Sequence, residues 1–240
     1  GLKTAVIRPD IDQQQFVIEP EFYNESDGTL EVTLLDGQKT IGRKSVKCAN
    51  SSTVILPVKK PKLWTPETPH LYDIIYRIKD TQGHLIDEVK SYAGMRKVHT
   101  ANGLFYLNNE PYYQRLVLDQ GYYPEGIWTA PTDEALKHDI ELGKESGFNG
   151  ARLHQKIFEE RYYYWADKLG YITWGESPSW GSDVNNELAV RNFISEWSET
   201  VIRDRNHPSL VTWTPFNETW GGGPDTYVRL IQDIYHITKA

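Results

Sequence analysis

The first part of the chain, from Thr4 to about Met95, shows short runs of β-branched and aromatic residues in which apolar and polar positions alternate. A period of two is the pattern of strands with one face buried. Three residue pairs lie between these runs and contain a residue that tolerates positive φ, so they are expected to form tight turns. They are Asp27-Gly28, Asp36-Gly37 and Gln82-Gly83. The pattern predicts an antiparallel sandwich. Its strands are expected at 16–23, 29–35, 40–46, 53–58, 71–79 and 85–92.

After Met95 the apolar residues recur at helical spacing between short apolar runs, which is typical of alternating strands and helices. Strands are expected at 112–118, 148–153, 171–174 and 210–216. Capping residues and prolines predict the boundaries of four helices. The first runs from Thr132 to near Gly147, the second ends at Gly170, the third runs from near Asn186 to a point before Pro208, and the fourth starts at Pro224. Four βα units follow, and spacing alone does not decide between a doubly wound sheet and a barrel.

Composition and charge exclude several classes of function. The formal net charge is −7 and the basic residues form no stripe, which argues against a nucleic-acid partner. Cys48 is the only cysteine, so neither an intrachain disulfide nor a thiolate metal cluster is expected. No run approaches the roughly 20 apolar residues that cross a bilayer, so no membrane partner is expected. The N-terminus lacks the layout of a signal peptide; the compartment stays open, and a longer parent could be periplasmic or secreted.

The sequence also lacks the motifs that hold common cofactors. No G-x-G-x-x-G or G-x-x-x-x-G-K-[ST] follows any expected strand, which argues against dinucleotide and nucleoside triphosphate sites. A metal hydrolase on the same barrel is weakly supported, because no H-E-x-x-H pair occurs. We therefore expect neither a cofactor nor a metal.

Polar side chains follow each expected parallel strand, where the active site of a barrel lies. They are Asp119, Gln120, Arg152, His154, Trp174, Glu176, Asn217 and Glu218. Glycoside hydrolysis needs one carboxylic acid to protonate the leaving oxygen and a second carboxylate to attack or to activate water. The end of the fourth strand should hold Glu218 in a partly dry site that favours its proton-carrying form. From position alone, an exposed loop glutamate is the alternative.

Several segments resemble glycoside hydrolase family 2, which contains β-galactosidases, β-glucuronidases and β-mannosidases. The resemblance rests on L-W-T-P-E-T-P-H-L-Y (63–72), G-M-R-K-V (94–98), L-F-Y-L-N-N-E-P (104–111), G-F-N-G-A-R (147–152), R-D-R-N-H-P-S-L-V-T-W (203–213) and F-N-E (216–218). It implies an immunoglobulin-like β-sandwich over residues 1–97. It also implies that residues 98–240 form the N-terminal half of a TIM-barrel catalytic domain, the first four βα units of a (β/α)8 barrel.

The resemblance also assigns roles to residues at the strand ends. Glu218 matches the general acid/base of the family, and Asn217 matches the asparagine that binds the sugar 2-hydroxyl. Arg152 matches an arginine beside the catalytic carboxylates, with a structural ion pair as its alternative role. His154 lies where relatives carry a Ser-His pair, and here the string is R-L-H-Q-K.

Four further residues are candidate substrate contacts. Asp119 is a candidate sugar contact, although L-D-Q-G-Y-Y departs from the N-R-H or N-Y-H of several relatives. Trp174 and Trp220 are candidates to stack on a sugar face, with core packing as the alternative for Trp174. Glu176 is a further carboxylate in a plausible loop.

The family's nucleophile is a second glutamate on a late barrel strand, about 5–5.5 Å from the acid/base in retaining enzymes. We expect that glutamate beyond Ala240, so the chain is interpreted as a fragment of a retaining exo-β-glycosidase that has little or no activity alone. A β-linked glycoside or oligosaccharide is the expected substrate, and the sugar stays open. Self-association through the incomplete barrel is expected. The alternative is a non-catalytic carbohydrate-binding or scaffold segment.

Overall fold

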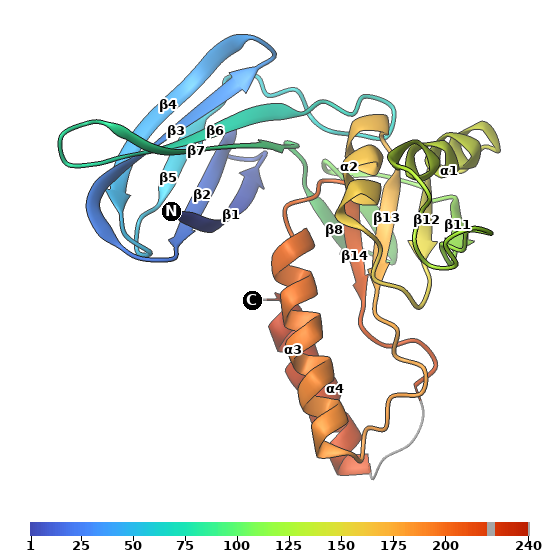
Figure 1. Cartoon of the computed structure of the whole chain (residues 1–240). Helices are drawn as coiled ribbons and strands as arrows, with labels where there is room; N and C mark the ends of the chain where they lie inside the picture. Colours follow the sequence, from blue (N-terminus) through green and yellow to red (C-terminus); the bar gives the residue numbers. More distant parts are fainter. Residues whose placement is uncertain (220–223, 240) are drawn as a thin grey trace. The chain divides into compact units, whose positions relative to one another are not determined.

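The computed structural model describes residues 1–219 and 224–239 and divides into two compact units. One unit comprises Gly1–Tyr113 together with Asn206–Pro208, and the other comprises Gln114–Arg205 and Ser209–Ala240. Each unit has its own hydrophobic core, and Figure 1 shows an all-β unit and an α/β unit. The change from a period of two to helical spacing in the sequence corresponds to this change of architecture.

The first unit is built around two antiparallel sheets. One sheet has the order β1 (Leu2–Asp10), β2 (Gln15–Phe22), β5 (Val54–Pro57). The other has the order β4 (Lys39–Cys48), β3 (Ser26–Asp36), β6 (Tyr72–Lys79), β7 (Leu85–Ala93). This is the immunoglobulin-like sandwich that the sequence predicts.

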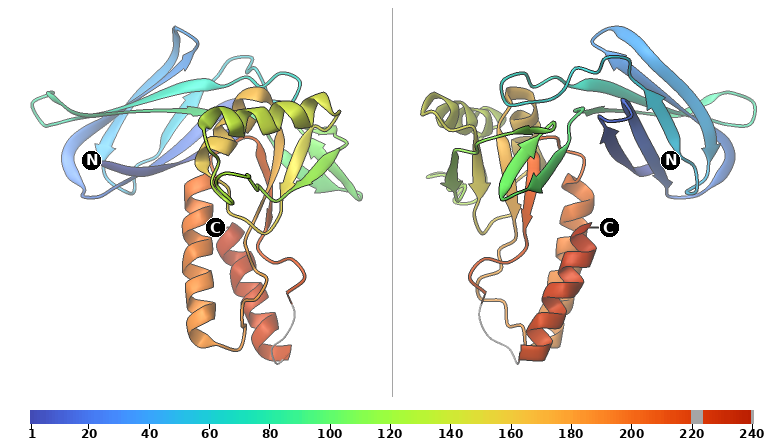
Figure 2. Two further views of the ribbon diagram at one scale, coloured as in Figure 1. Left: turned by 45° about the vertical axis from the view of Figure 1, so that its right-hand side comes forward. Right: turned by 180° about the vertical axis from the view of Figure 1, so that it is seen from behind.

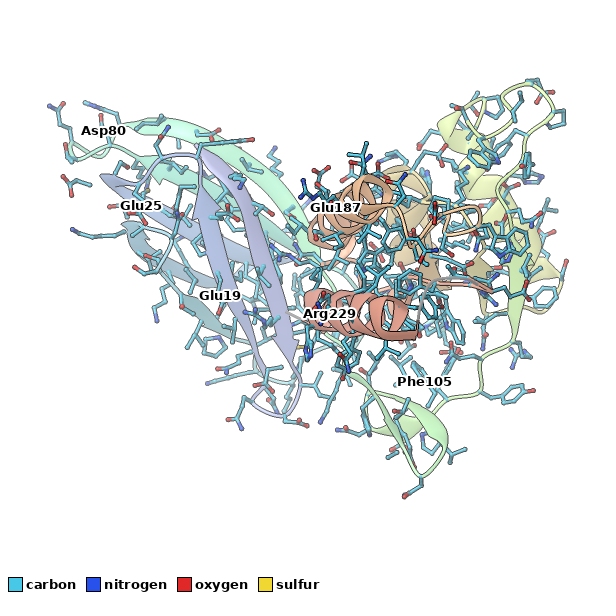
Figure 3. The ribbon with its side chains drawn as sticks, turned by 90° about the horizontal axis from the view of Figure 1, so that it is seen from below. Glu19, Glu25, Asp80, Phe105, Glu187 and Arg229 are labelled. Carbon is cyan, nitrogen blue, oxygen red and sulfur yellow. The ribbon has the colours of Figure 1, made fainter. Side chains whose placement is uncertain are left out.

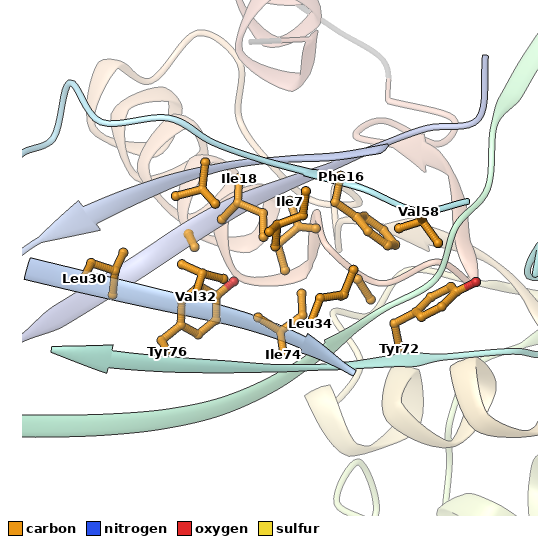
Figure 4. Packing of buried hydrophobic residues seen from close by; sticks show 14 of the residues in the cluster. Ile7, Phe16, Ile18, Leu30, Val32, Leu34, Val58, Tyr72, Ile74 and Tyr76 are labelled. Carbon is orange, nitrogen blue, oxygen red and sulfur yellow. The ribbon is translucent and has the colours of Figure 1, made fainter. Parts of the chain in front are cut away.

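The core of the sandwich comes from the alternating positions of both sheets. Phe16 and Ile18 on β2 and Leu30, Val32 and Leu34 on β3 are fully buried, one residue in two. Figure 4 shows these side chains packed between the strands. Burial of this apolar surface is the main stabilising term of the unit.

Three local expectations for this unit were wrong or incomplete. Asp27-Gly28 forms no tight turn: both residues lie within β3, at an irregularity of its pairing with β4. A Cβ on Gly28 would lie 2.5 Å from the Lys79 carbonyl oxygen, so the glycine serves a close approach of two strands. The strand β1 was not predicted. Nor was a small antiparallel sheet of β8 (Val98–Ala101), β9 (Leu104–Leu107) and β10 (Glu110–Pro111).

The second unit is a parallel sheet with helices, as expected for part of a TIM barrel. Its strands stand in the order β11 (Leu116–Asp119), β12 (Gly150–Leu153), β13 (Ile172–Glu176), β14 (Leu210–Thr214). The helices that follow them are α1 (Asp133–Glu145), α2 (Glu160–Leu169), α3 (Glu187–Asp204) and α4 (Pro224–Lys239). Figure 2 shows α3 and α4 side by side in both views. Among the described residues, no helix combines the length and the apolar character needed to cross a membrane.

The helix boundaries follow local capping chemistry. The Thr132 side chain accepts a hydrogen bond from the Ala135 N–H at the start of α1, and Asn186 accepts from Leu188 N–H and Ala189 N–H at the start of α3. Gly170 ends α2 with φ 71°, a left-handed conformation that suits glycine. These boundaries were predicted from the sequence.

The two faces of the parallel sheet differ in what they contact. Ala151 and Leu153 on β12 point into a buried cluster with residues of α1 and α2. Arg152 alternates with them and therefore points to the opposite face. A second cluster holds α3 against α4 through Trp197, Leu230 and other residues; Glu187 and Arg229 mark these two helices in Figure 3.

Candidate functional site

The ends of three neighbouring parallel strands bring Arg152, Glu176 and Asn217 into one hydrogen-bonded network. Arg152 Nε donates to Glu176 Oε2 at 2.8 Å, and Arg152 Nη2 donates to Asn217 Oδ1 at 2.5 Å. Arg152 lies on β12, Glu176 ends β13, and Asn217 follows β14. Parallel strands place their carboxyl ends at one edge of the sheet, which is why residues 65 positions apart meet here.

Glu176 is the fixed end of this network. Its side chain is 0% exposed, whereas that of Arg152 is 29% exposed. Its Oε1 accepts the Gln155 N–H at 3.1 Å, and its Oε2 accepts from Arg152. Both carboxylate oxygens are thus engaged within the protein. Glu176 therefore orients Arg152, and the ion pair named as the alternative role of Arg152 is present.

The backbone around Asn217 is held by a buried hydroxyl. Ser179 is 0% exposed, and its Oγ accepts the Asn217 N–H at 3.0 Å. The Thr219 hydroxyl donates to the same oxygen at 3.0 Å, and Gln155 Nε2 lies 3.3 Å from it. Asn217 is thereby fixed on both sides, through its side chain by Arg152 and through its backbone by Ser179.

His154 joins the network next to Asn217. Its Nε2 lies 3.3 Å from Asn217 Nδ2, and its Nδ1 lies 3.0 Å from Gln120 Nε2. The ring of Trp180 meets the imidazole edge to face, with centroids 5.4 Å apart. His154 is 8% exposed, so these contacts replace water around most of the ring.

Glu218 follows Asn217 in the chain, and its side chain is not part of the hydrogen-bonded network. It is exposed, and it lines a pocket of about 430 Å³ together with Ser179, Trp180 and Thr219. The expectation of a partly dry site is not met in the described structure, where Glu218 makes no hydrogen bond or ion pair with residues 1–219 or 224–239.

The backbone at two of these positions is left-handed. Glu218 has φ 48° and Gln155 has φ 55°. A side chain with a Cβ pays a steric penalty of about 1–2 kcal/mol in this region, and such conformations cluster at functional sites. At Gln155 the conformation has a visible use, because it accompanies the hydrogen bond of the Gln155 N–H to Glu176.

Asp119 is not brought together with the network. It stands in register with Leu153, whose side chain is in the helix-side cluster, and its Oδ2 accepts from the Tyr162 hydroxyl at 3.4 Å. Its Oδ1 accepts the Gly121 N–H at 2.8 Å. Burial raises the pKa of the Asp119 carboxyl above its ordinary value. The placement gives the interpretation of Asp119 as a sugar contact no geometric support, because the side chain points to the opposite face of the sheet from Arg152.

The two tryptophans named as stacking candidates have different outcomes. Trp174 is half-buried, in register with Arg152, and its Nε1 donates to Gln114 Oε1 at 2.8 Å. It lies on the same face as Arg152, so stacking on a ligand stays a prediction for it. Trp220 lies outside the described residues.

Sequence reasoning missed Gln155, Ser179 and Trp180. All three follow strands β12 and β13 by two to four residues, in irregular segments. The rule that the site lies after each strand would have found them if it had been carried beyond the first one or two residues. In the described part of the chain, no group of three or more His, Cys, Asp or Glu could hold a metal ion.

The comparisons with known proteins agree with this architecture. Residues 2–96 match the model of glycosyl hydrolases family 2, and residues 98–240 match the model of the family 2 TIM barrel domain. A β-galactosidase of Pseudoalteromonas haloplanktis is 26% identical over 92% of this chain, and β-galactosidase 2 of Enterobacter cloacae is 31% identical over 76% of it. The chain spans only 23% and 20% of these two relatives.

Among solved structures, a β-glucuronidase from Ruminococcus gnavus in complex with D-glucuronic acid superimposes with a TM-score of 0.87. The match covers 99% of this chain and 40% of the other, at 23% identity, and so bears on the fold. The two family models together cover nearly the whole chain. The chain belongs to glycosyl hydrolase family 2.

Proposed function

We propose that this chain supplies the general acid/base, Glu218, and part of the sugar site of a retaining exo-β-glycosidase, whose nucleophile lies outside residues 1–240. The observation that carries the proposal is the hydrogen bond of Arg152 to Asn217 Oδ1, the residue before Glu218. It fixes the direction of the Asn217 amide beside a carboxyl that faces an open pocket.

The chemistry divides between neighbouring residues. Glu218 in its protonated form would give its proton to the leaving glycosidic oxygen and, as a carboxylate, would then take a proton from the attacking water. Asn217 would donate its free N–H to a hydroxyl of the sugar. Arg152 and Glu176 would act through Asn217. The substrate is a β-linked glycoside or oligosaccharide, in keeping with relatives named β-galactosidase and β-glucuronidase.

The role of Glu218 can be separated from a structural role by varying the leaving group. A glycoside with a strongly basic leaving group needs protonation, whereas a highly activated aryl glycoside does not. In the product of the complete gene, Glu218→Gln should slow hydrolysis of the first by about 10²–10⁴-fold and slow bond cleavage in the second far less. Equal losses on both substrates would contradict the proposal. Glu196→Gln, at an exposed position of α3, is the matched control.

The chain alone should turn over little or no β-glycoside, because the described residues offer no free second carboxylate at the site. Glu176, the nearest candidate in the network, is held by Arg152 and by the Gln155 N–H. A panel of aryl β-galactosides, β-glucuronides and β-mannosides tests both the isolated chain and the longer product. Binding of sugar without turnover by both would favour the carbohydrate-binding alternative.

We further propose that the chain associates with a second copy of itself. In the described part of the chain, β11 and β14 each have one edge without a neighbouring strand. Unpaired edges next to exposed apolar side chains favour association.

A further inference from the structure

His154 lies between two amide groups, and an amide nitrogen lies nearest to each of its ring nitrogens. Asn217 Nδ2 is 3.3 Å from Nε2, and Gln120 Nε2 is 3.0 Å from Nδ1. A neutral imidazole has one N–H donor and one bare acceptor nitrogen, so it accepts from one NH2 group only. One of the two amides must therefore present its oxygen.

Arg152 decides which amide that is. A guanidinium has donors and no acceptor, and Arg152 Nη2 faces Asn217 Oδ1 at 2.5 Å. Turning the Asn217 amide over would set its NH2 group against that guanidinium. Arg152 itself is fixed by the buried Glu176 carboxylate, at 2.8 Å. Asn217 thus keeps its oxygen on Arg152 and donates to His154 Nε2.

The remaining assignments follow in order. Nε2 accepts and is bare, so the proton of the neutral ring is on Nδ1. Nδ1–H then needs an acceptor, and Gln120 has to turn its Oε1 to it. The orientation of an amide is inferred from its hydrogen bonds, and nothing else in the described structure holds Gln120 in the opposite sense.

We infer that His154 is a positioning residue whose neutral ring carries its proton on Nδ1, and that it transmits a fixed hydrogen-bond direction from Glu176 through Arg152 and Asn217 to Gln120. The result is two oriented donors at the site. Asn217 Nδ2 keeps one N–H, and Gln120 Nε2 keeps both, for the hydroxyl oxygens of a pyranoside. This last step rests on the proposed function, whereas the tautomer of His154 does not.

The test is a long-range ¹H–¹⁵N correlation spectrum of the imidazole rings in the 240-residue chain at about pH 8.5, well above the ordinary histidine pKa of about 6.5. The signals of His154 are identified by their loss in His154→Gln. We expect the N–H signature at Nδ1 and the far-downfield signature of a bare nitrogen at Nε2. His138, exposed on α1, gives the solvent-equilibrated reference in the same spectrum. An Nε2–H ring or a mixture like that of His138 would overturn the inference.

Two variants test the direction of control. In Asn217→Asp both oxygens accept, and Arg152 beside them keeps the carboxylate ionised, so Nε2 of His154 must gain a proton. In Gln120→Met the acceptor for Nδ1–H is lost, yet the Nδ1–H form should persist, because Arg152 and Asn217 impose it. A bare Nε2 in Asn217→Asp would also overturn the inference. So would a mixture of the two tautomers in Gln120→Met. None of these readouts needs turnover, so loss of the glycosidase proposal would leave them intact, and the reverse also holds.

Discussion

Glu218 combines an exposed carboxyl with a left-handed backbone, φ 48°, immediately after a residue whose side chain and backbone are both fixed. Nothing in the described packing requires a glutamate there. A backbone conformation that costs free energy, at a position without stabilising contacts, indicates that the residue serves function and not stability.

That strain predicts an unusual order of stabilities at this position. Glu218→Gly should be more stable than Glu218→Ala by about 1 kcal/mol, because glycine adopts positive φ without a steric penalty. Urea unfolding of the two variants measures the difference. The same pair at Glu196, in the middle of α3, should show the reverse order by about 1 kcal/mol. A higher stability of the alanine variant than of the glycine variant at both positions would contradict the argument.

The buried carboxyl of Asp119 predicts how the stability of the chain depends on pH. Burial raises the pKa of its carboxyl, so the folded chain binds more protons than the unfolded chain above about pH 4. Its ionisation therefore costs stability as the pH rises from there through the folded pKa. In Asp119→Asn that loss should be absent, and the free energy of unfolding relative to the unchanged chain should increase with pH.

Asp133 is the matched control for this measurement. The hydrogen bond from Arg161 lowers the pKa of the Asp133 carboxyl, so its contribution has the opposite sign. It is present above the unfolded pKa and is lost as the pH falls. The stability of Asp133→Asn relative to the unchanged chain should thus change in the opposite sense. Urea unfolding between about pH 2 and pH 8 compares the two, because the Asp133 contribution changes below about pH 4 and the Asp119 contribution changes above it, and parallel curves would contradict the assignment for Asp119.

At the scale of elements, the sequence predicted what local chemistry determines. The starts of α1 and α3 at Thr132 and Asn186 and the end of α2 at Gly170 depend on hydrogen bonds or φ within a few residues. Asp27-Gly28 was misread because its conformation depends on the distant Lys79 carbonyl. The local sequence around Asp27-Gly28 does not indicate which distant residue will lie next to it.

The site was predictable in part for the same reason. The rule of strand ends located Arg152, Glu176, Asn217 and Glu218, since the alternation along a strand places its side chains once the register is known. The face of Asp119 depends on its register with Leu153 of β12, which short apolar runs leave open by one residue. A shift of the register by one residue moves a side chain to the other face of the sheet. In the structure, the Asp119 side chain lies on the helix side and not on the face of Arg152.

Gly150, the first residue of β12, tests how tightly the parallel sheet is packed. A Cβ there would lie 2.3 Å from the Ile172 carbonyl oxygen of the neighbouring strand, so the backbone must move. We expect Gly150→Ala to lower the free energy of unfolding by about 1–3 kcal/mol. At Gly175 on β13, the nearest atom is the Leu210 Cδ1 methyl at 3.0 Å, which can give way. Gly175→Ala should be the milder change, and urea unfolding that ranks the two in the opposite order would contradict this account.

At the scale of the whole molecule, the second unit exposes apolar side chains on β11, the strand at one edge of its sheet, and on α4, the helix after β14, the strand at the other edge. Leu118 on β11 is 54% exposed, and Val228, Ile231 and Tyr235 on α4 are exposed at a spacing of three and four residues, which places them on one helical stripe. A surface of this kind next to an unpaired strand edge is characteristic of an interface. The stripe and the edge together support association of two copies.

Light scattering during size-exclusion chromatography measures this association. We expect a mass above the 27.7 kDa of one chain that rises with concentration. A lysine in place of Leu118 or Ile231 puts a charge into the apolar surface and should return the mass to that of one chain, because an unpaired buried charge is strongly disfavoured. Ile86→Lys, at an exposed apolar position of β7 in the other unit, should leave the association unchanged. A mass of one chain at every concentration would refute self-association, and equal loss in all three variants would move the interface away from the edges of the parallel sheet.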